Sequence, residues 1–217
     1  MELKISLYKI NPVSGGEETE LYTEISNEDN LERNKFIVSA EMFFELGLSL
    51  NAELPIDISR EKYDEIIDLS EKNSAIKKGI YILSFSDNTK KGLAKKLVSK
   101  GFSRHSAEYA SYFLAEAGYI NEESSAELLA RDMAEKKLYG PKRIAVALCE
   151  KGFSKEAIDK VSNEFFVDFS AICRKRIEKM GGLSIFSDKD EKKKAVAALL
   201  RYGFSYDDIK DAIKKKL

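Results

Sequence analysis

The sequence contains few of the residues that carry metal, redox or acid–base chemistry. It has two cysteines, Cys149 and Cys173, and a single histidine, His105. Neither cysteine has a second cysteine or a histidine at the spacing of metal ligands, so the sequence predicts no metal site. We interpret both cysteines as core or boundary residues of helices. His105 has no serine or cysteine partner that the sequence can assign, which makes a catalytic role improbable.

Long apolar runs and nucleotide-binding loops are also missing. No stretch of about 18 apolar residues is present, so we expect no membrane-spanning helix. The opening Met1–Lys4 lacks the apolar stretch of a secretory signal, and we expect a cytoplasmic protein. Gly181 and Gly182 are not followed by the Lys-Ser or Lys-Thr that ends a phosphate-binding loop. Because no nucleophile, base and orienting group can be grouped, an enzyme is the least favoured class and we expect no cofactor.

Charged residues are abundant and unevenly distributed. The 217 residues are 43% apolar and 34% charged, which is typical of a globular protein with a highly charged surface. Residues 1–60 hold 5 Lys and Arg against 12 Asp and Glu, whereas residues 61–217 hold 31 against 25. This asymmetry indicates an acidic and a mildly basic region with different roles.

A seven-residue pattern occurs three times at intervals of 51 residues, as Leu97–Ser103, Leu148–Ser154 and Leu199–Ser205. A glycine just past a helix can adopt the left-handed backbone of the C′ position, and the phenylalanine after it can contact the leucine at C3. The serine is a preferred N-cap, so a second helix is expected to begin at once. The predicted turn residues are Gly101, Phe102, Gly152, Phe153, Gly203 and Phe204.

Apolar residues at helical spacing lie on both sides of each turn, and a further helix fits in front of each pair. Asn73-Ser74 is expected to introduce the first of these preceding helices and Asn121 the second, while the third is expected to contain Phe165. Pro141 after Gly140 marks the start of the middle helix of the second unit. The pattern therefore predicts three units of three helices, each of which buries its apolar face against its neighbours.

The first sixty residues have a different pattern. Alternating apolar residues predict short strands, and Asn11–Gly16 is expected to form a turn. Ser39 can cap a short helix that Gly47 ends, and Ser59 can cap a connecting helix. The predicted strands are Leu3–Leu7, Leu21–Ile25 and Lys35–Val38.

The fold class expected from these patterns is mainly α. Three tandem three-helix repeats form an elongated scaffold, and a small β-rich module precedes them. We expect four segments: the β-rich module at 1–60 and helical repeats at 61–118, 119–165 and 166–217.

These residues resemble the RecX family, which regulates the bacterial recombinase RecA. The resemblance covers roughly residues 75–165 well and the third repeat more loosely. Phe36–Ser39 followed by Leu46–Leu48 also resembles an extension that some members carry before the helices. The matching segments are Leu93–Phe102, Ala117–Glu123, Ala126-Glu127, Arg131, Tyr139–Ile144 and Leu148–Phe153.

The resemblance implies a non-enzymatic protein that lies along the RecA filament on single-stranded DNA and lowers its ATPase, strand-exchange and coprotease activities. It implies roles in homologous recombination, DNA repair and the SOS response, and we expect a monomer. The link Ser84–Thr89 departs from the arginine-rich link of the family, which weakens the expectation of DNA contacts in that loop.

Basic residues cluster around the first two turns. They can meet DNA phosphates or an acidic surface of RecA, or they can form a solvated helix face. A general DNA-binding helical array and a helical adaptor for another protein remain as alternative functions. The candidate binding residues are Lys90, Lys91, Lys95, Lys96, Lys100, Arg104, Arg131, Lys136, Lys137, Lys142 and Arg143.

Overall fold

The structure is a computed structural model of the chain, and it describes residues 4–13, 15–27 and 30–214. Contacts within the chain divide it into two compact units. The first contains Met1–Ser86 and Leu93–Tyr119, and the second contains Asp87–Gly92 and Ile120–Leu217.

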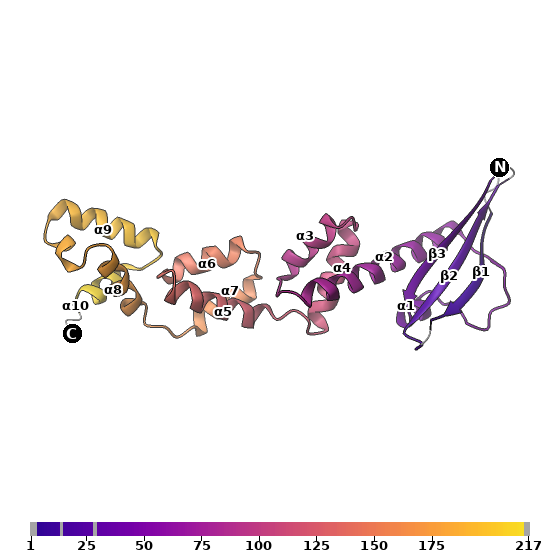
Figure 1. Ribbon diagram of the computed structural model, residues 1–217, viewed down its shortest axis with the longest axis horizontal. Helices are drawn as coiled ribbons and strands as arrows, with labels where there is room; N and C mark the ends of the chain where they lie inside the picture. The colour runs from indigo at the N-terminus through magenta and orange to yellow at the C-terminus, as the bar shows by residue number, and fades with distance from the viewer. Residues whose placement is uncertain (1–3, 14, 28–29, 215–217) are drawn as a thin grey trace. The chain divides into compact units, whose positions relative to one another are not determined.

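The first unit begins with an antiparallel sheet of strand order β3-β2-β1-β4 (Figure 1). Its inner face is apolar because alternate residues such as Ile5, Leu7 and Leu21 point to the same side. The predicted β-rich module is confirmed, but β1 extends through part of the predicted turn and pairs Pro12 with Thr19. Leu3, at the predicted start of the first strand, lies outside the described residues. The strands are β1 (Lys4–Pro12), β2 (Glu18–Ser26), β3 (Leu31–Ser39) and β4 (Ile56–Asp57).

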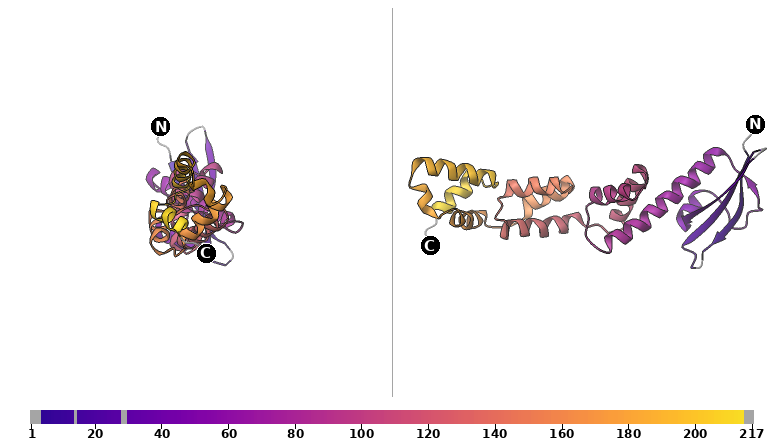
Figure 2. Two further views of the ribbon diagram at one scale, coloured as in Figure 1. Left: turned by 90° about the vertical axis from the view of Figure 1, so that its left-hand side faces the viewer. Right: turned by 45° about the horizontal axis from the view of Figure 1, so that its top comes forward.

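Two helices, α1 (Ala40–Glu45) and α2 (Arg60–Leu83), follow in this unit, and α2 packs against β3 (Figure 2). Ser39 and Ser59 cap them as predicted. However, α2 is one continuous helix, so the predicted helix start at Asn73-Ser74 is wrong. The Asn73 side chain is buried and donates hydrogen bonds to Glu18 Oε1 (2.8 Å) and to the carbonyl of Ile37 (3.3 Å). It therefore fixes the helix to the sheet and does not cap a new helix.

The first repeat consists of the second half of α2, α3 (Lys90–Ser99) and α4 (Arg104–Glu116). Its core contains Leu93, Leu97 and Leu114, all fully buried. Gly79 on α2 lies so close to α4 that a Cβ atom there would be 2.5 Å from Leu114 Cδ1. The absence of a side chain at this position lets the two helices approach.

The second unit contains the other two repeats, and each has its own apolar cluster. Gly181 and Gly182 follow the end of α8, and the N–H of Gly182 donates to the carbonyl of Ile177. We had expected Phe165 in the first helix of the third repeat, and this is wrong. Phe165 lies at the end of α7, where its N–H donates to the carbonyl of Val161. The second repeat is α5 (Glu122–Glu135), α6 (Pro141–Glu150) and α7 (Lys155–Glu164), and the third is α8 (Phe169–Lys179), η1 (Leu183–Phe186), α9 (Lys189–Arg201) and α10 (Tyr206–Lys214).

The three glycine turns have the predicted geometry. Gly101, Gly152 and Gly203 have φ angles of +97°, +84° and +92°. In each turn the phenylalanine N–H donates to the carbonyl of the leucine at C3, over 3.2 to 3.3 Å, which is the Schellman pattern. The serine after each phenylalanine is the N-cap of the next helix. No helix in the described part of the chain is long and apolar enough to cross a membrane.

Candidate functional site

At two places in the second unit, the start of a middle helix contacts the glycine turn of the repeat that follows. We call these contacts the first joint, formed by residues 87–92 and the turn at Gly152, and the second joint, formed by residues 138–143 and the turn at Gly203. Their residues correspond at an interval of 51. At the first joint, a Cβ atom on Gly152 would lie 3.4 Å from Lys91 Cδ and 3.5 Å from Thr89 Oγ1, which is ordinary contact.

The second joint is closer. The N–H of Gly140 donates to the carbonyl of Tyr202 (2.8 Å), and the N–H of Lys142 donates to that of Gly203 (3.2 Å). A Cβ atom on Gly140 would lie 2.4 Å from the carbonyl carbon of Gly203, so a side chain there would require the backbone to move. Leu138, which precedes this contact with φ of 53°, is buried in the core of the third repeat.

A buried glutamate holds the first joint. Glu122 is 9% exposed and accepts hydrogen bonds from the N–H of Lys90 (2.7 Å) and the N–H of Ser154 (2.9 Å). Burial alone would raise the pKa of Glu122, but the hydrogen bonds from Ser154 and Lys90 outweigh it and lower the pKa. One carboxylate thus satisfies the N-terminal N–H groups of α3 and of α7. In the first unit, Glu71 accepts bonds from Ser103 in the same way.

The third repeat replaces this glutamate by Cys173, which is fully buried. The residue that corresponds to Lys90 is Pro141, which has no N–H to donate. The helix start at Ser205 is satisfied within the turn, because its N–H donates to Asp208 Oδ2 (2.7 Å). A carboxylate is therefore not needed at position 173, and burial raises the pKa of the Cys173 thiol to about 12. Cys149, in contrast, is exposed, so its interpretation as a core or boundary residue is wrong.

Aromatic rings and cations alternate at the second joint. The rings of Tyr139 and Tyr202 have centroids 6.1 Å apart. The guanidinium of Arg176 lies 3.5 Å from the centroid of Tyr202, and Arg143 and Lys137 lie 5.5 and 6.0 Å from that of Tyr139. These distances are within the range of cation–π attraction. We call these five residues the cation–aromatic cluster.

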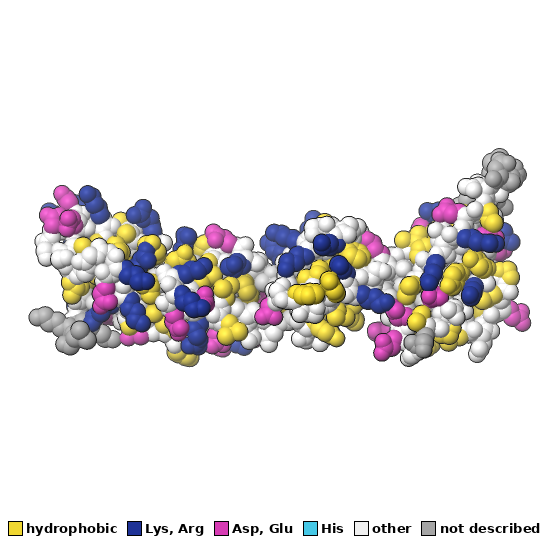
Figure 3. Space-filling view, viewed as in Figure 1, with side chains coloured by type: hydrophobic (Ala, Val, Ile, Leu, Met, Phe, Trp, Pro, Cys, Tyr) yellow, Lys and Arg dark blue, Asp and Glu magenta, His cyan; other side chains and the backbone are white. Residues whose placement is uncertain are grey.

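The candidate basic residues fall into two groups. Lys95, Lys96 and Lys100 are exposed on or just after α3 in the first unit, where Arg104 pairs with Glu108 (2.8 Å). In the second unit, Lys90, Lys91 and Lys142 belong to the joints, and Lys137 and Arg143 come together around Tyr139. Arg131 pairs with Glu127 and Lys136 with Asp132, both along α5. Figure 3 shows Lys and Arg side chains gathered over α3 and, in the other unit, over α6.

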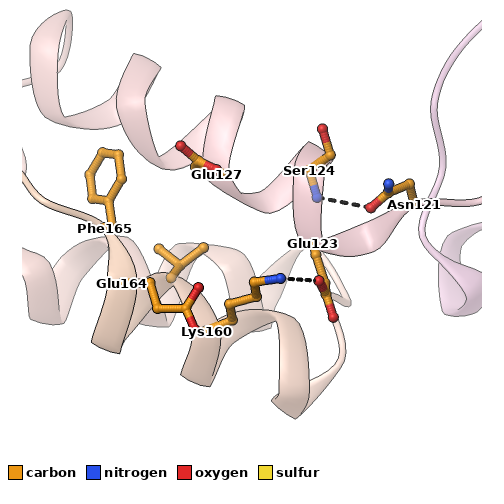
Figure 4. Close-up of a pocket in the computed structure, with 8 residues that line it drawn as sticks. Asn121, Glu123, Ser124, Glu127, Lys160, Glu164 and Phe165 are labelled. Carbon is orange, nitrogen blue, oxygen red and sulfur yellow. Dashed lines mark hydrogen bonds and ion pairs between the residues drawn. The ribbon is translucent and has the colours of Figure 1, made fainter.

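An acidic pocket lies on the second repeat between α5 and α7 (Figure 4). It has a volume of about 290 Å³ and is lined by Glu123, Glu127 and Glu164. Lys160 points across it and pairs with Glu123. Among residues 4–13, 15–27 and 30–214, no group of three or more His, Cys, Asp and Glu side chains is placed to hold a metal ion.

Arg176 and Tyr202 of the cation–aromatic cluster, and the link that Glu122 makes between two helix starts, were not predicted from the sequence. The interval of 51 residues was the signal for Glu122, because it also links Glu71, Glu122 and Cys173. Tyr202 corresponds to Lys100 and Lys151 of the other turns, and this difference marks the second joint as distinct.

Comparison with proteins of known identity gives several relatives, each described as "Regulatory protein RecX". The one from Caldanaerobacter subterraneus subsp. tengcongensis is 32% identical over 131 residues, which are 60% of this chain and 64% of that protein. The one from Halorhodospira halophila is 30% identical over 60% of this chain and 81% of that protein. The one from Clostridium perfringens strain 13 is 29% identical over 83% of this chain and 84% of that protein.

Two solved structures share the fold. "Crystal structure of regulatory protein RecX" superposes with a TM-score of 0.70 at 18% identity and covers 99% of this chain and 100% of that chain. "Crystal structure of RecX from Lactobacillus salivarius" superposes with a TM-score of 0.58 at 23% identity and covers 66% of this chain and 95% of that chain. Comparison with protein-family models gives no match.

Proposed function

Because the chain belongs to the RecX family, whose members are regulatory proteins, we propose that it is a non-enzymatic regulator of RecA. It binds the RecA filament on single-stranded DNA in the cytoplasm and lowers its ATPase, strand-exchange and coprotease activities. Family membership carries this proposal, and the arrangement of charges on the repeats supports it.

The cation–aromatic cluster supports a filament as the binding partner. Arg143 and Lys137 share the ring of Tyr139, and all of these side chains lie beside the contact of two repeats. Cations can neutralise phosphates or acidic side chains, and ring faces can stack on bases. The exposed Lys95 and Lys96 on α3 add charge of the same sign.

The test is the ATPase rate of RecA on single-stranded DNA in the presence of stoichiometric amounts of the chain. We expect the rate to fall. The double variant Lys137→Glu with Arg143→Glu should inhibit at least about tenfold less effectively, because like charges across an interface cost several kcal/mol. Lys95→Glu with Lys96→Glu tests the second group in the same assay.

A matched control reverses two exposed lysines of α10, Lys210→Glu with Lys214→Glu, which changes net charge equally. This control should inhibit like the unchanged chain. An unchanged ATPase rate at every ratio of the chain to RecA would remove the proposed function. Equal loss in all three double variants would instead indicate a general effect of charge.

A second candidate function is direct binding to DNA without RecA, and the cation–aromatic cluster favours it as well. Each neutralised phosphate releases counterions. The logarithm of the affinity for naked single-stranded DNA should therefore fall with the logarithm of the salt concentration, with a slope of about −1 for each phosphate contact. A salt titration without RecA separates the two functions, since a regulator that recognises the filament needs RecA for high affinity.

A further inference from the structure

The two joints differ in how completely they are filled. The side chains of Tyr139, Arg176 and Tyr202 pack together at the second joint, where a pocket of about 420 Å³ remains between Leu138 and α8. The residues of the first joint that correspond to Leu138, Tyr139, Arg176 and Tyr202 are Asp87, Asn88, Ser125 and Lys151. Four large side chains are thus replaced by three short polar ones and an exposed lysine. Phe204 is fully buried at the second joint, while its counterpart Phe153 is only half-buried.

This difference leaves a groove of about 510 Å³ at the first joint, a size typical of binding sites. We call it the first-joint groove. Its apolar wall includes Leu128, which is 65% exposed. Its lining residues include Asp87, Ser125, Leu128, Asp132, Lys151 and Phe153.

We infer that the first-joint groove binds a segment of a partner protein that inserts one aromatic side chain next to an arginine or lysine. The second joint shows what this backbone arrangement accommodates, since there Arg176 stacks on the ring of Tyr202 within the same chain. At the first joint the ring and the cation come from the partner. The ring lies against Leu128 and Phe153, and the cation lies in the space that Ser125, the counterpart of Arg176, leaves open.

Charge decides between a protein and a nucleic acid as the occupant. Asp87 and Asp132 both line the groove, Asp132 also pairs with Lys136 along α5, and Lys151 is the only basic side chain among the described residues that line it. Two carboxylates attract a guanidinium or ammonium group and repel phosphates. The groove therefore complements a basic, aromatic peptide, and this inference does not depend on the identity of the protein that the chain regulates.

The experiment follows the methyl signals of Leu128 and Leu129 by NMR while a peptide is added to the full chain. The probe is acetyl-Tyr-Arg-amide, and acetyl-Ala-Arg-amide and acetyl-Tyr-Glu-amide are its controls. We expect saturable shifts at Leu128 and Leu129 with the probe, and binding about tenfold weaker or less with either control, which corresponds to about 1.4 kcal/mol. No saturable shift, or equal binding of the three peptides, would overturn the inference.

A variant that fills the groove sharpens the test. Ser125→Arg with Lys151→Tyr introduces the residues of the second joint, and we expect it to lose probe binding at least about tenfold while keeping its melting temperature. Lys155→Tyr on α7 is the matched control, because Lys155 is exposed and does not line the groove. It should bind the probe like the unchanged chain.

If the filled variant does not fold, Leu128→Lys replaces it, because Leu128 is exposed and its counterpart in the third repeat is Lys179. The added cation should weaken probe binding at least about tenfold. Undiminished binding by the folded filled variant, or by Leu128→Lys, would contradict the inference. So would the same methyl shifts on addition of a ten-nucleotide oligothymidine.

Discussion

The first and second joints use one backbone arrangement with two different chemistries. At the first joint a buried carboxylate, Glu122, joins two helix starts through hydrogen bonds to Lys90 and Ser154. At the second joint two glycines, Gly140 and Gly203, bring the backbones into direct contact. Within the second unit, a helix start can therefore be held against a glycine turn either through a polar link or through close packing, and the two should respond differently to substitution.

The largest effect is expected where the two chemistries are exchanged. Cys173→Glu places a carboxylate in the third repeat where Pro141 offers no N–H, so a charge is buried without its partner. We expect a loss of roughly 3–5 kcal/mol in the free energy of unfolding. Urea unfolding at neutral pH measures it.

The double variant Cys173→Glu with Pro141→Lys restores the pair found at the first joint. It should recover part of the loss, with a coupling of about 0.5–3 kcal/mol between the two sites. Strict additivity of the two substitutions would contradict the proposed link between an N–H at position 141 and an acceptor at 173.

The next effect concerns the close contact of the second joint. Gly140→Ala puts a Cβ atom 2.4 Å from the carbonyl carbon of Gly203, and backbone cannot yield as a flexible side chain can. We expect destabilisation by about 3 kcal/mol. Thermal unfolding followed by circular dichroism tests this, and a melting temperature equal to that of the unchanged chain would rule out the contact.

A smaller and pH-dependent effect is expected at the first joint. Glu122→Gln keeps the shape but removes the charge that accepts the N–H groups of Lys90 and Ser154, at a cost of roughly 1–3 kcal/mol near neutral pH. Because the pKa of Glu122 is lowered in the folded chain, its contribution is present above the ordinary value of 4.5 and is lost as pH falls through the lowered value.

The difference in unfolding free energy between the unchanged chain and Glu122→Gln should therefore shrink from about pH 6 to about pH 3. Glu71 titrates in the unchanged chain and in Glu122→Gln alike, so its contribution to the unfolding free energy cancels in this difference. A difference that stayed constant over this range would mean that the Glu122 carboxylate is not stabilised by folding.

The smallest effect is expected at the first glycine turn. Gly101 has φ of +97° but no atom lies within 4 Å of a Cβ placed there. Gly101→Ala therefore adds only backbone strain, about 1–2 kcal/mol. Gly203→Ala adds the same strain and a contact of 2.3 Å with the N of Arg143, so the comparison of the two variants by urea unfolding isolates the packing of the second joint.

Local features of this fold could be predicted from sequence, and long-range ones could not. Gly101, Phe102 and Ser103 act within a few residues of one another, so their roles as turn, contact and cap follow from residue type. Asn73 has the same local preferences as a cap, but a partner on β2 outweighs them. The continuous α2 thus depends on a contact that no local pattern contains.

The candidate site shows the same division. Lys137 and Arg143 could be recognised as basic residues near a turn, but their shared ring, Tyr139, and its neighbour Tyr202 come together only in the folded second unit. Glu122 lies in the first turn of α5, where a carboxylate suits the helix dipole, but its partners are 32 residues away on either side. The four segment boundaries and the roles of the basic residues remain proposals.

The most direct test of the proposed regulation is retention of the chain by RecA filaments. Immobilised single-stranded DNA is saturated with RecA and a non-hydrolysable ATP analogue, and the amount of chain that stays bound is compared with DNA alone and with RecA alone. We predict strong retention by the filament and little by either component. Equal retention by naked DNA, or none by the filament, would contradict it.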